Sequence, residues 1–389
     1  MLNSDDALDT QASVRRANVR RALQLVFRDS GTQTRAGIAR ATGLTAATAS
    51  SLVAELIDDR LVVEGAQAAS TGGKRATTLS IDAGHHVILA MVIRPTDARL
   101  SLLALDGSEI EGGRIVYGPD DRDRMLDDAV ARVAAEYGDR LLIAGVQLPG
   151  ATDGRLVLES VQLGWRNVPL AERLERALGV PVLLVNDVDA EAIAEAAVEE
   201  ESSGHRLFIH IGVGIGAAVT LDGRLAPGPR DRAGEIGHVQ VVFGDEARLC
   251  RCGRYGCLES ASSMTAMLGD DVDDALDVDA IRALAARADE VRFAEAARAL
   301  ARAIKLVAAL LDPAEVVLGG PVVALGERFL EAVRAETGYV ATGTADVPVR
   351  YADRRVPETT GVAQLALTAA LGVRWSREQL MTASGSLSE

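Results

Sequence analysis

A short segment that carries every cysteine of the chain constrains its fold most. Cys250, Cys252 and Cys257 lie within eight residues, and His238 precedes the first of them by twelve positions. Three thiolates and one imidazole form the ligand set of a structural tetrahedral zinc site, in which four protein ligands leave no open position for a catalytic water. Two other interpretations stay open, namely three clustered reduced cysteines or one disulfide with a spare thiol. We predict a structural Zn2+ ion bound by His238, Cys250, Cys252 and Cys257.

Two carboxylates bracket the predicted metal loop. Glu235 lies three residues before His238, and Glu259 lies two residues after Cys257. The ordered pattern Glu-x-Gly-His followed by Cys-x-Cys-Gly-x-x-Gly-Cys-x-Glu resembles the signature of the ROK family, the bacterial group of repressors, open reading frames and sugar kinases. The resemblance implies a two-lobed actin-like, ribonuclease-H-like fold over most of the chain. It also implies a metal that holds a sugar site in shape.

The charge of the chain is distributed unevenly. The 389 residues are 48% apolar and carry a formal net charge of −15. Between residues 13 and 50 there are seven arginines and one acid, whereas residues 1–75 as a whole carry +2 and residues 76–389 carry −17. A basic end beside an acidic body is expected when only that end meets nucleic-acid phosphates.

Neither a membrane span nor a leader pattern is visible in the sequence. No run approaches the roughly 18 apolar residues of a membrane-spanning helix, and the first residues lack a basic segment followed by an apolar one. We therefore expect a soluble, cytoplasmic protein without a membrane partner.

The N-terminal residues predict a winged helix-turn-helix that binds a double-stranded DNA operator. Gly43 supplies the permissive backbone of the turn, and Thr45 is a suitable N-cap for the helix whose start would enter the major groove. A small helical bundle used for dimerisation is the alternative interpretation. We expect helices over 14–28, 35–41 and 45–58, strands over 61–63 and 77–79, and a wing tip at 72–75. The predicted DNA contacts are Arg35, Thr45, Ala46, Ala47, Thr48, Ser50, Lys74 and Arg75.

The predicted recognition helix is poor in base-reading side chains. It presents small residues and hydroxyls, without the Arg, Asn or Gln that pair bidentately with bases. Most of the affinity should therefore come from phosphate contacts, and from Lys74 and Arg75 in a narrow minor groove.

From residue 81 the pattern changes to alternating strands and helices, which predicts an α/β architecture in two successive halves. Strands are expected over 87–93, 99–105, 141–148, 182–185, 207–211, 217–221 and 316–318, and helices over 123–137, 188–199, 293–311 and 361–371. The expected domains are a winged helix-turn-helix at 1–80, a first lobe at 81–200, a second lobe with the metal loop at 201–375, and a tail at 376–389.

The resemblance to the ROK family implies a sugar site. Pro149-Gly150 and Gly164-Trp165 match segments on the sugar side of the family, and Asn186-Asp187 follows a buried strand, where α/β sheets place ligand groups. In the sugar kinases of the family, the aspartate that matches Asp187 is the general base. Asn186-Asp187 could equally be a helix cap if the cysteine loop were absent. The implied sugar-binding residues are Gly150, Asn186, Asp187, Glu235, His238 and Glu259.

The phosphate half of a kinase site departs from the family pattern. Family kinases carry Asp-x-Gly-x-Thr after the first strand, whereas residues 92–96 read Val-Ile-Arg-Pro-Thr. Pro95 has no N–H to donate, and Arg94 places a bulky side chain where backbone must approach phosphate. The glycine-rich turn at 212–216 fits either a hairpin turn or a phosphate cradle. Val161-Gln162 replaces a usual Pro-Asn pair, which leaves the identity of the sugar open.

These patterns favour a sugar-responsive transcriptional regulator, a repressor that forms a homodimer or homotetramer. Its kinase-like body would sense a sugar or sugar phosphate without phosphoryl transfer, with Asp187 as a vestigial base. The main alternative is an active ATP-dependent sugar kinase with an appended DNA-binding domain. A regulator that answers to another protein is a third.

Overall fold

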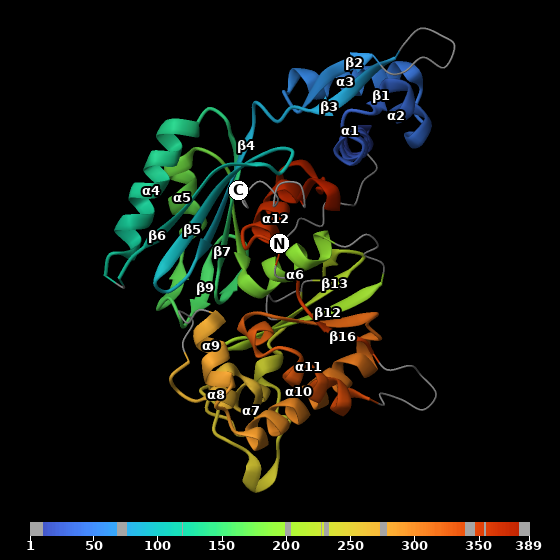
Figure 1. Cartoon of the computed structure of the whole chain (residues 1–389). Coiled ribbons are helices and arrows are strands. Elements are labelled where there is room, and N and C mark those ends of the chain that lie inside the picture. The colour runs from blue at the N-terminus through green and yellow to red at the C-terminus, as the bar shows by residue number, and fades with distance from the viewer. Residues whose placement is uncertain are drawn as a thin grey trace. The chain divides into compact units, whose positions relative to one another are not determined.

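The computed structural model describes residues 11–67, 76–118, 120–198, 204–226, 228, 233–272, 278–338, 347–353 and 355–380. Contacts divide the chain into two compact units (Figure 1). The first unit contains Met1–Ala190 and Val356–Glu389, and the second contains Glu191–Arg355. The chain therefore passes between the units twice, once within a helix and once after Arg355.

The N-terminal part of the first unit is the winged helix-turn-helix that the sequence predicts. Its helices are α1 (Gln11–Arg28), α2 (Arg35–Thr42) and α3 (Ala46–Asp58), and its strands are β1 (Gln33–Thr34), β2 (Val62–Gln67) and β3 (Thr77–Ile81). The strands form one antiparallel sheet in the order β1-β3-β2. Phe27, Ile38 and Leu56 are fully buried between these elements. The expected wing tip at 72–75 lies outside the described residues.

Local chemistry explains the turn between α2 and α3. Gly43 ends α2 in the left-handed region, with φ 73°, which a residue without a Cβ adopts at little cost. Thr45 then caps α3, because its side-chain oxygen accepts a hydrogen bond from the Thr48 N–H at 3.1 Å. Both roles are those that the sequence predicts.

The rest of the first unit is built on a five-stranded sheet in the order β11-β7-β4-β5-β6. Strands β4, β5 and β6 form an antiparallel meander, and β7 and β11 extend it in parallel to β4. Helices α4 and α5 cover one face, whereas α12 packs against β4 and β7 on the other (Figure 1). The elements are β4 (Val87–Ile93), β5 (Asp97–Ala104), β6 (Glu109–Val116), β7 (Leu141–Leu148), β11 (Val182–Asn186), α4 (Arg122–Tyr137), α5 (Leu170–Leu178) and α12 (Thr360–Leu371).

The sheet of the second unit repeats this connectivity, in the order β14-β13-β12-β15-β16. An antiparallel set of three strands is again followed by two strands that run parallel to the first of them. This repetition is the duplicated actin-like α/β fold that the sequence predicts. The elements are β12 (His205–Ile211), β13 (Ile215–Leu221), β14 (Arg224–Leu225), β15 (Glu315–Gly319), β16 (Val349–Tyr351), α10 (Glu290–Leu311) and α11 (Glu327–Thr337).

Smaller elements connect these layers. A three-stranded sheet follows β7, helix α6 contains the first passage between the units, and short helices follow the cysteine segment. They are β8 (Ala151–Thr152), β9 (Val157–Ser160), β10 (Trp165–Val168), α6 (Asp187–Ala197), α7 (Leu258–Ser262), α8 (Met264–Leu268), α9 (Val278–Ala285) and the 3-10 helices Ile236–His238, Gly244–Glu246 and Pro321–Leu325.

The C-terminal boundary differs from the expected domain at 201–375. Helix α12 belongs to the first unit, because Val362, Ala363, Ala366 and Leu367 are fully buried and the helix packs against β4 and β7. The sequence shows an apolar helix but not which sheet it covers. We also did not predict α5, β6 or α11.

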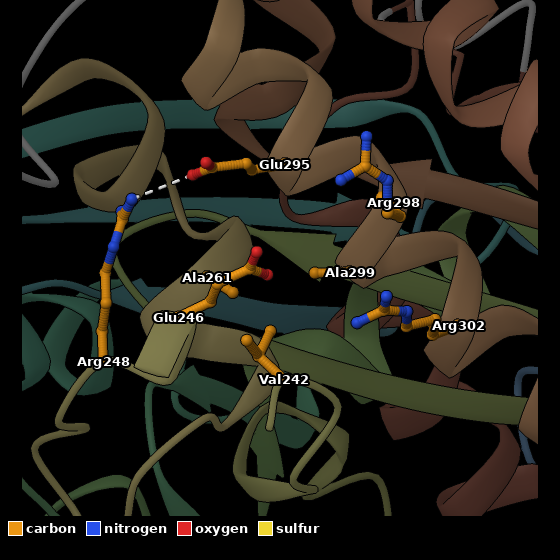
Figure 2. Close-up of a pocket in the computed structure, with 8 residues that line it drawn as sticks. All are labelled: Val242, Glu246, Arg248, Ala261, Glu295, Arg298, Ala299 and Arg302. Carbon is orange, nitrogen blue, oxygen red and sulfur yellow. Dashed lines mark hydrogen bonds and ion pairs between the residues drawn. The ribbon is translucent and has the colours of Figure 1, made fainter. Parts of the chain in front are cut away.

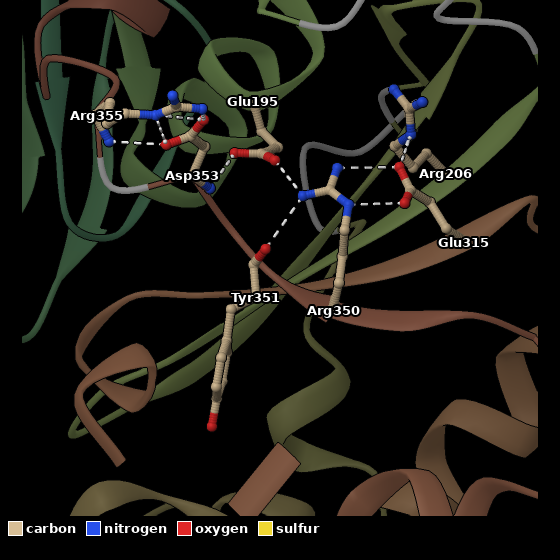
Figure 3. A network of polar contacts seen from close by, with 7 residues as sticks. All are labelled: Glu195, Arg206, Glu315, Arg350, Tyr351, Asp353 and Arg355. Atoms are coloured by element: carbon tan, nitrogen blue, oxygen red, sulfur yellow. Dashed lines mark hydrogen bonds and ion pairs between the residues drawn. The ribbon is translucent and has the colours of Figure 1, made fainter. Parts of the chain in front are cut away.

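A polar network holds the end of the second unit (Figure 3). The buried Glu195 carboxylate of α6 pairs with Arg350 on β16 and accepts a hydrogen bond from the Asp353 N–H at 2.9 Å. Arg350 also pairs with Glu315 on β15, with Nε–Oε2 at 2.8 Å. These contacts link α6 to the segment that ends at the second passage between the units.

A side-chain amide joins the winged helix-turn-helix to the C-terminal segment within the first unit. Gln24 on α1 donates to the Arg374 carbonyl at 2.9 Å and accepts from the Arg374 N–H at 2.8 Å. The next residue, Trp375, is buried and donates from Nε1 to the Leu105 carbonyl at 2.7 Å.

Among the described helices, none combines the length and apolarity needed to cross a lipid bilayer.

A glycine in α12 allows this helix to pack closely, which leads to a stability prediction. A Cβ at Gly361 would lie 1.8 Å from the Ala190 carbonyl oxygen. Alanine normally favours a helix over glycine by about 1 kcal/mol, but overpacking costs about 1–3 kcal/mol or more. We expect Gly361→Ala to lower the urea midpoint of unfolding. Gly113→Ala, where nothing lies within 4 Å of the added Cβ, is the control. Equal midpoints for the two variants would contradict this packing.

Candidate metal and sugar site

The structure brings together the four residues that the sequence predicts as metal ligands. One potential ligand atom from each of His238, Cys250, Cys252 and Cys257 lies within 4.8 Å of the others. His238 Nδ1 is 3.6 Å from Cys250 Sγ, and Cys252 Sγ is 3.6 Å from Cys257 Sγ. All three cysteines are free thiols, and their separation far exceeds the roughly 2.05 Å of a disulfide. The cluster can hold a metal ion.

The backbone of the loop explains how these side chains converge. The Cys250 N–H donates to the Arg254 carbonyl at 2.8 Å, and the Gly253 N–H donates to the Cys250 carbonyl at 2.9 Å. Gly256 has φ 72°, and a Cβ there would lie 1.9 Å from the Val242 carbonyl oxygen. Glycine is therefore required between the second and third thiols.

The three thiols differ in their protonation. A hydrogen bond from the Arg254 backbone N–H lowers the pKa of the exposed Cys252 to about 6. Burial raises the pKa of Cys257 to about 12 and raises that of Cys250 as well. A cation that binds all three sulfurs must therefore displace protons from the two buried thiols, because the thiolate is the ligand.

The carboxylates that bracket the loop differ in exposure. Glu235 is exposed and precedes the 3-10 helix that ends at His238. Glu259 is 5% exposed on α7, and its Oε2 accepts hydrogen bonds from Arg251 Nη2 at 2.9 Å and from the Ile215 N–H at 3.2 Å. Arg251 is a functional candidate that the sequence analysis missed, since its only signal was its place between two cysteines.

The first unit carries the other predicted sugar residues. Asn186 ends β11 and donates from Nδ2 to the Gly150 carbonyl at 2.9 Å. Its Oδ1 also accepts from the Val188 N–H at 2.9 Å, so Asn186 caps α6 as well as holding Gly150. Asp187 is half-buried at the first position of α6. Gly150 has φ 118°, and a Cβ there would lie 2.4 Å from the Glu159 carbonyl oxygen.

A buried arginine holds the Gly164-Trp165 segment, which the sequence analysis also assigned to the sugar side. Arg122, at the start of α4, donates to the Leu163 carbonyl at 2.7 Å and lies over the Trp165 ring at 4.6 Å. A cation at a helix N-terminus opposes the helix dipole, so these two contacts must offset that cost. Arg122 was also absent from our sequence prediction.

Ion pairs occupy the turn that would meet nucleotide phosphates. Arg94 pairs with Asp97 at 2.9 Å and with Glu358. The Tyr117 hydroxyl contacts the Arg94 carbonyl at 2.9 Å and the Asp97 carbonyl at 2.7 Å. Arg114 reaches the same Asp97 carboxylate at 3.0 Å. Ion pairs between side chains of the protein therefore hold this turn in place.

The glycine-rich turn at 212–216 is a hairpin between β12 and β13. Ile211 pairs with Ile215, and the Gly212 N–H donates to the Gly214 carbonyl at 2.9 Å. The His210 ring lies against Gly212 and Gly320, where added Cβ atoms would come within 2.9 and 2.6 Å of ring atoms. His210 Nδ1 is 2.8 Å from Glu191 Oε2.

The winged helix-turn-helix exposes most of the predicted DNA contacts that the structure describes. The exposed residues on or next to α3 are Thr45, Ala46, Ala47, Thr48 and Ser50. Arg35 is half-buried and pairs with Glu64 at 2.5 Å, whereas Arg40 in the last turn of α2 is exposed. Lys74 and Arg75 lie outside the described residues. Their contacts with DNA stay a prediction.

A separate small pocket in the second unit has mixed charge (Figure 2). Arg248 pairs with Glu295 at 3.0 Å, and Arg302 donates to the Val241 carbonyl at 3.0 Å. These polar groups thus contact other groups of the chain and stabilise the fold, and we assign the pocket no function. The lining residues are Val242, Glu246, Arg248, Ala261, Glu295, Arg298, Ala299 and Arg302.

Known proteins resemble this chain over most of its length. A family model described as ROK family matches residues 88–367. A Caldicellulosiruptor sp. (strain Rt8B.4) protein with the provisional name xylose repressor is 29% identical over 250 residues, 62% of each chain. An N-acetylmannosamine kinase from Salmonella typhi is 36% identical over 178 residues, 44% of this chain and 60% of the kinase. The matched regions thus span about three fifths of the length of these two relatives.

A solved structure extends the similarity to the N-terminal part. It is a ROK family transcriptional regulator described as a homolog of the E. coli Mlc protein. The TM-score is 0.73 at 24% identity, and the match covers 95% of this chain and 98% of that one. Because the match covers nearly the whole chain, this likeness shows that the two proteins share their fold, including the N-terminal winged helix-turn-helix.

The thiol cluster leads to a test of metal binding. Cys252→Ser should remove one of four ligands and release the metal, because metal affinity is coupled to the order of the loop. Elemental analysis of freshly purified protein should find about one bound metal per wild-type chain and much less in the variant. Tyr255→Phe, an exposed change in the same loop, should keep the metal. Wild-type protein that contains no metal would refute the site.

Proposed function

The chain belongs to the ROK family, and from this membership we propose that it is a sugar-responsive, DNA-binding transcriptional repressor of the cytoplasm. One observation carries the proposal. A winged helix-turn-helix precedes a ROK body whose first phosphate turn is closed by the ion pairs of Arg94. The names repressor and transcriptional regulator among similar proteins support the same conclusion.

The acceptor half of a sugar site supports a sensing role. Within the second unit, Glu235, His238 and Glu259 offer carboxylates and an imidazole that hydrogen-bond hydroxyls. Within the first unit, Asn186 and Asp187 offer an amide and a carboxylate that do the same. If His238 binds the metal through Nδ1, which faces Cys250, its Nε2 stays available for a sugar hydroxyl. A sugar or sugar phosphate is the proposed effector.

We infer that the cation of the cysteine loop is zinc. Three thiolates and one imidazole suit zinc better than the oxygen-seeking Ca2+ or Mg2+, and four protein ligands suit a structural role. A bound ion would fix the loop between His238 and Glu259, and therefore the two proposed sugar ligands at its ends.

The operator contact is proposed for the exposed start of α3 together with neighbouring arginines. A regulator of this kind would bind a two-fold operator as a dimer, or as a tetramer built from dimers. Sugar binding would shift the population between two forms, by no more than its difference in affinity for them. The Gln24–Arg374 pair joins α1 to the C-terminal segment. Through this pair, the α/β part of the chain could influence the winged helix-turn-helix.

An active sugar kinase is the second candidate, favoured by the similarity to an N-acetylmannosamine kinase. Against it stand the side chains at the phosphate turns. Arg94 and Pro95 cannot hold Mg2+ as an aspartate does, and phosphoryl transfer depends on positioning and electrostatic stabilisation of the transferred group.

The DNA proposal can be tested with a duplex from the promoter region of the gene that encodes this chain. Arg75→Ala should weaken binding and lower the salt slope by about 1, because the positive charge of an arginine in the minor groove, close to the phosphates, releases about one counterion. Thr48→Ala should have a smaller effect, since the Thr48 hydroxyl already lies 2.9 Å from the Thr45 hydroxyl. Arg166→Ala, on the body, is the control. Negligible effects of both Arg75→Ala and Thr48→Ala would contradict the prediction that the wing supplies much of the affinity for DNA.

The absence of phosphoryl transfer can be tested directly. Protein incubated with ATP, Mg2+ and its best-binding sugar should form no sugar phosphate, although the sugar itself raises the melting temperature by mass action. Asp187→Ala should weaken sugar binding, because it removes a hydroxyl partner. Turnover at kinase rates of about 1 per second or faster would instead support the enzyme.

A further inference from the structure

Arg251 makes two contacts with one buried carboxylate. Its Nε lies 2.7 Å from Glu259 Oε1, and its Nη2 lies 2.9 Å from Glu259 Oε2. The Glu259 side chain is 7% exposed, whereas that of Arg251 is 48% exposed. This side-on bidentate geometry is the strong form of an arginine–carboxylate pair. It fixes the carboxylate in position and orientation.

The glycine-rich turn takes part in the same arrangement. The Ile215 N–H donates to Glu259 Oε2 at 3.2 Å. A Cβ on Gly214 would lie 3.0 Å from Arg251 Nη2 and 3.4 Å from Glu259 Oε2, so the absence of a side chain makes room for the pair. The anion that this turn receives is therefore the carboxylate of Glu259.

The burial of Glu259 explains why its carboxylate needs the positive charge of the Arg251 guanidinium. A buried carboxylate without a partner is strongly unfavourable. Cys250 Sγ lies 3.8 Å from Glu259 Oε1, so a side chain of the metal loop also contacts this carboxylate. Arg251 is adjacent in sequence to Cys250 and Cys252, so the loop that orders the thiols also delivers the guanidinium to Glu259.

We propose that Arg251 is a positioning residue that holds Glu259 ready for a sugar hydroxyl and couples this carboxylate to the metal loop. The part about sugar rests on the proposed function. Arg251 itself is not a metal ligand, so its loss should leave the four ligands in place while releasing Glu259.

A double-mutant cycle tests the pair without any sugar. Arg251→Met should lower the melting temperature, and adding Glu259→Gln should restore part of the loss, because the uncompensated charge is then removed. The matched control is the Arg248–Glu295 pair of the same unit. Arg248 is 49% exposed, like Arg251, but Glu295 is 47% exposed. Arg248→Met and Glu295→Gln should show little coupling. Equal coupling in the two cycles would overturn the role of Arg251.

Sugar titrations test the positioning role. With metal content unchanged, Arg251→Met should weaken sugar binding by about 10- to 100-fold, the range expected when a hydrogen bond to a charged group is lost. Arg251→Lys should give an intermediate loss, because it keeps the charge without the bidentate geometry, and Arg248→Met should bind like wild type. Unchanged affinity in Arg251→Met would overturn the proposal. If wild type binds none of the sugars, the proposed function fails, while the thermal cycle still decides whether Arg251 holds Glu259.

Discussion

The convergence of three thiols and one imidazole within 4.8 Å is the constraint on which the site depends. The segment from His238 to Cys257 contains two isolated β-bridges, Gln240–Cys257 and Leu249–Tyr255, and the short 3-10 helix Gly244–Glu246. It exposes Phe243, Leu249 and Tyr255. Such a segment buries little apolar surface of its own. A cation bound by the four side chains would supply the order that a hydrophobic core supplies elsewhere. The position of Glu259 and its contact with Arg251 then follow from the position of the loop.

The duplicated sheets decide where the other functional groups lie. In each unit an antiparallel set of strands is extended by parallel strands, whose carboxyl ends are suited to ligand groups. Asn186 stands at such an end, on β11 of the first unit. Its amide holds Gly150 and its carbonyl oxygen caps α6, so one side chain fixes both the loop after β7 and the start of the helix that carries Asp187.

The charges at two turns support the proposal that this body senses a ligand. At the turn after β4, Arg94 and Arg114 pair with the buried Asp97, and Arg94 also reaches Glu358. At the hairpin after β12, Glu259 and Arg251 occupy the glycine turn. Both turns are thus neutralised by groups of the chain itself, which suits a body that senses a ligand better than one that positions a nucleotide.

The sequence alone determined the features that local chemistry controls. Residue type, spacing and apolar runs predict the cluster of one histidine and three cysteines, the Thr45 cap, the Gly43 turn and the buried strands β4 and β7. Only the tertiary structure decided which distant groups meet. Helix α12 joins the first unit because Gly361 and Gly145 let it approach Ala190 and β7 closely, a fit that periodicity does not encode. Arg251 and Arg122 could not be predicted for the same reason. A charged residue is expected to lie in solvent unless the structure shows the buried carboxylate or carbonyl to which it donates.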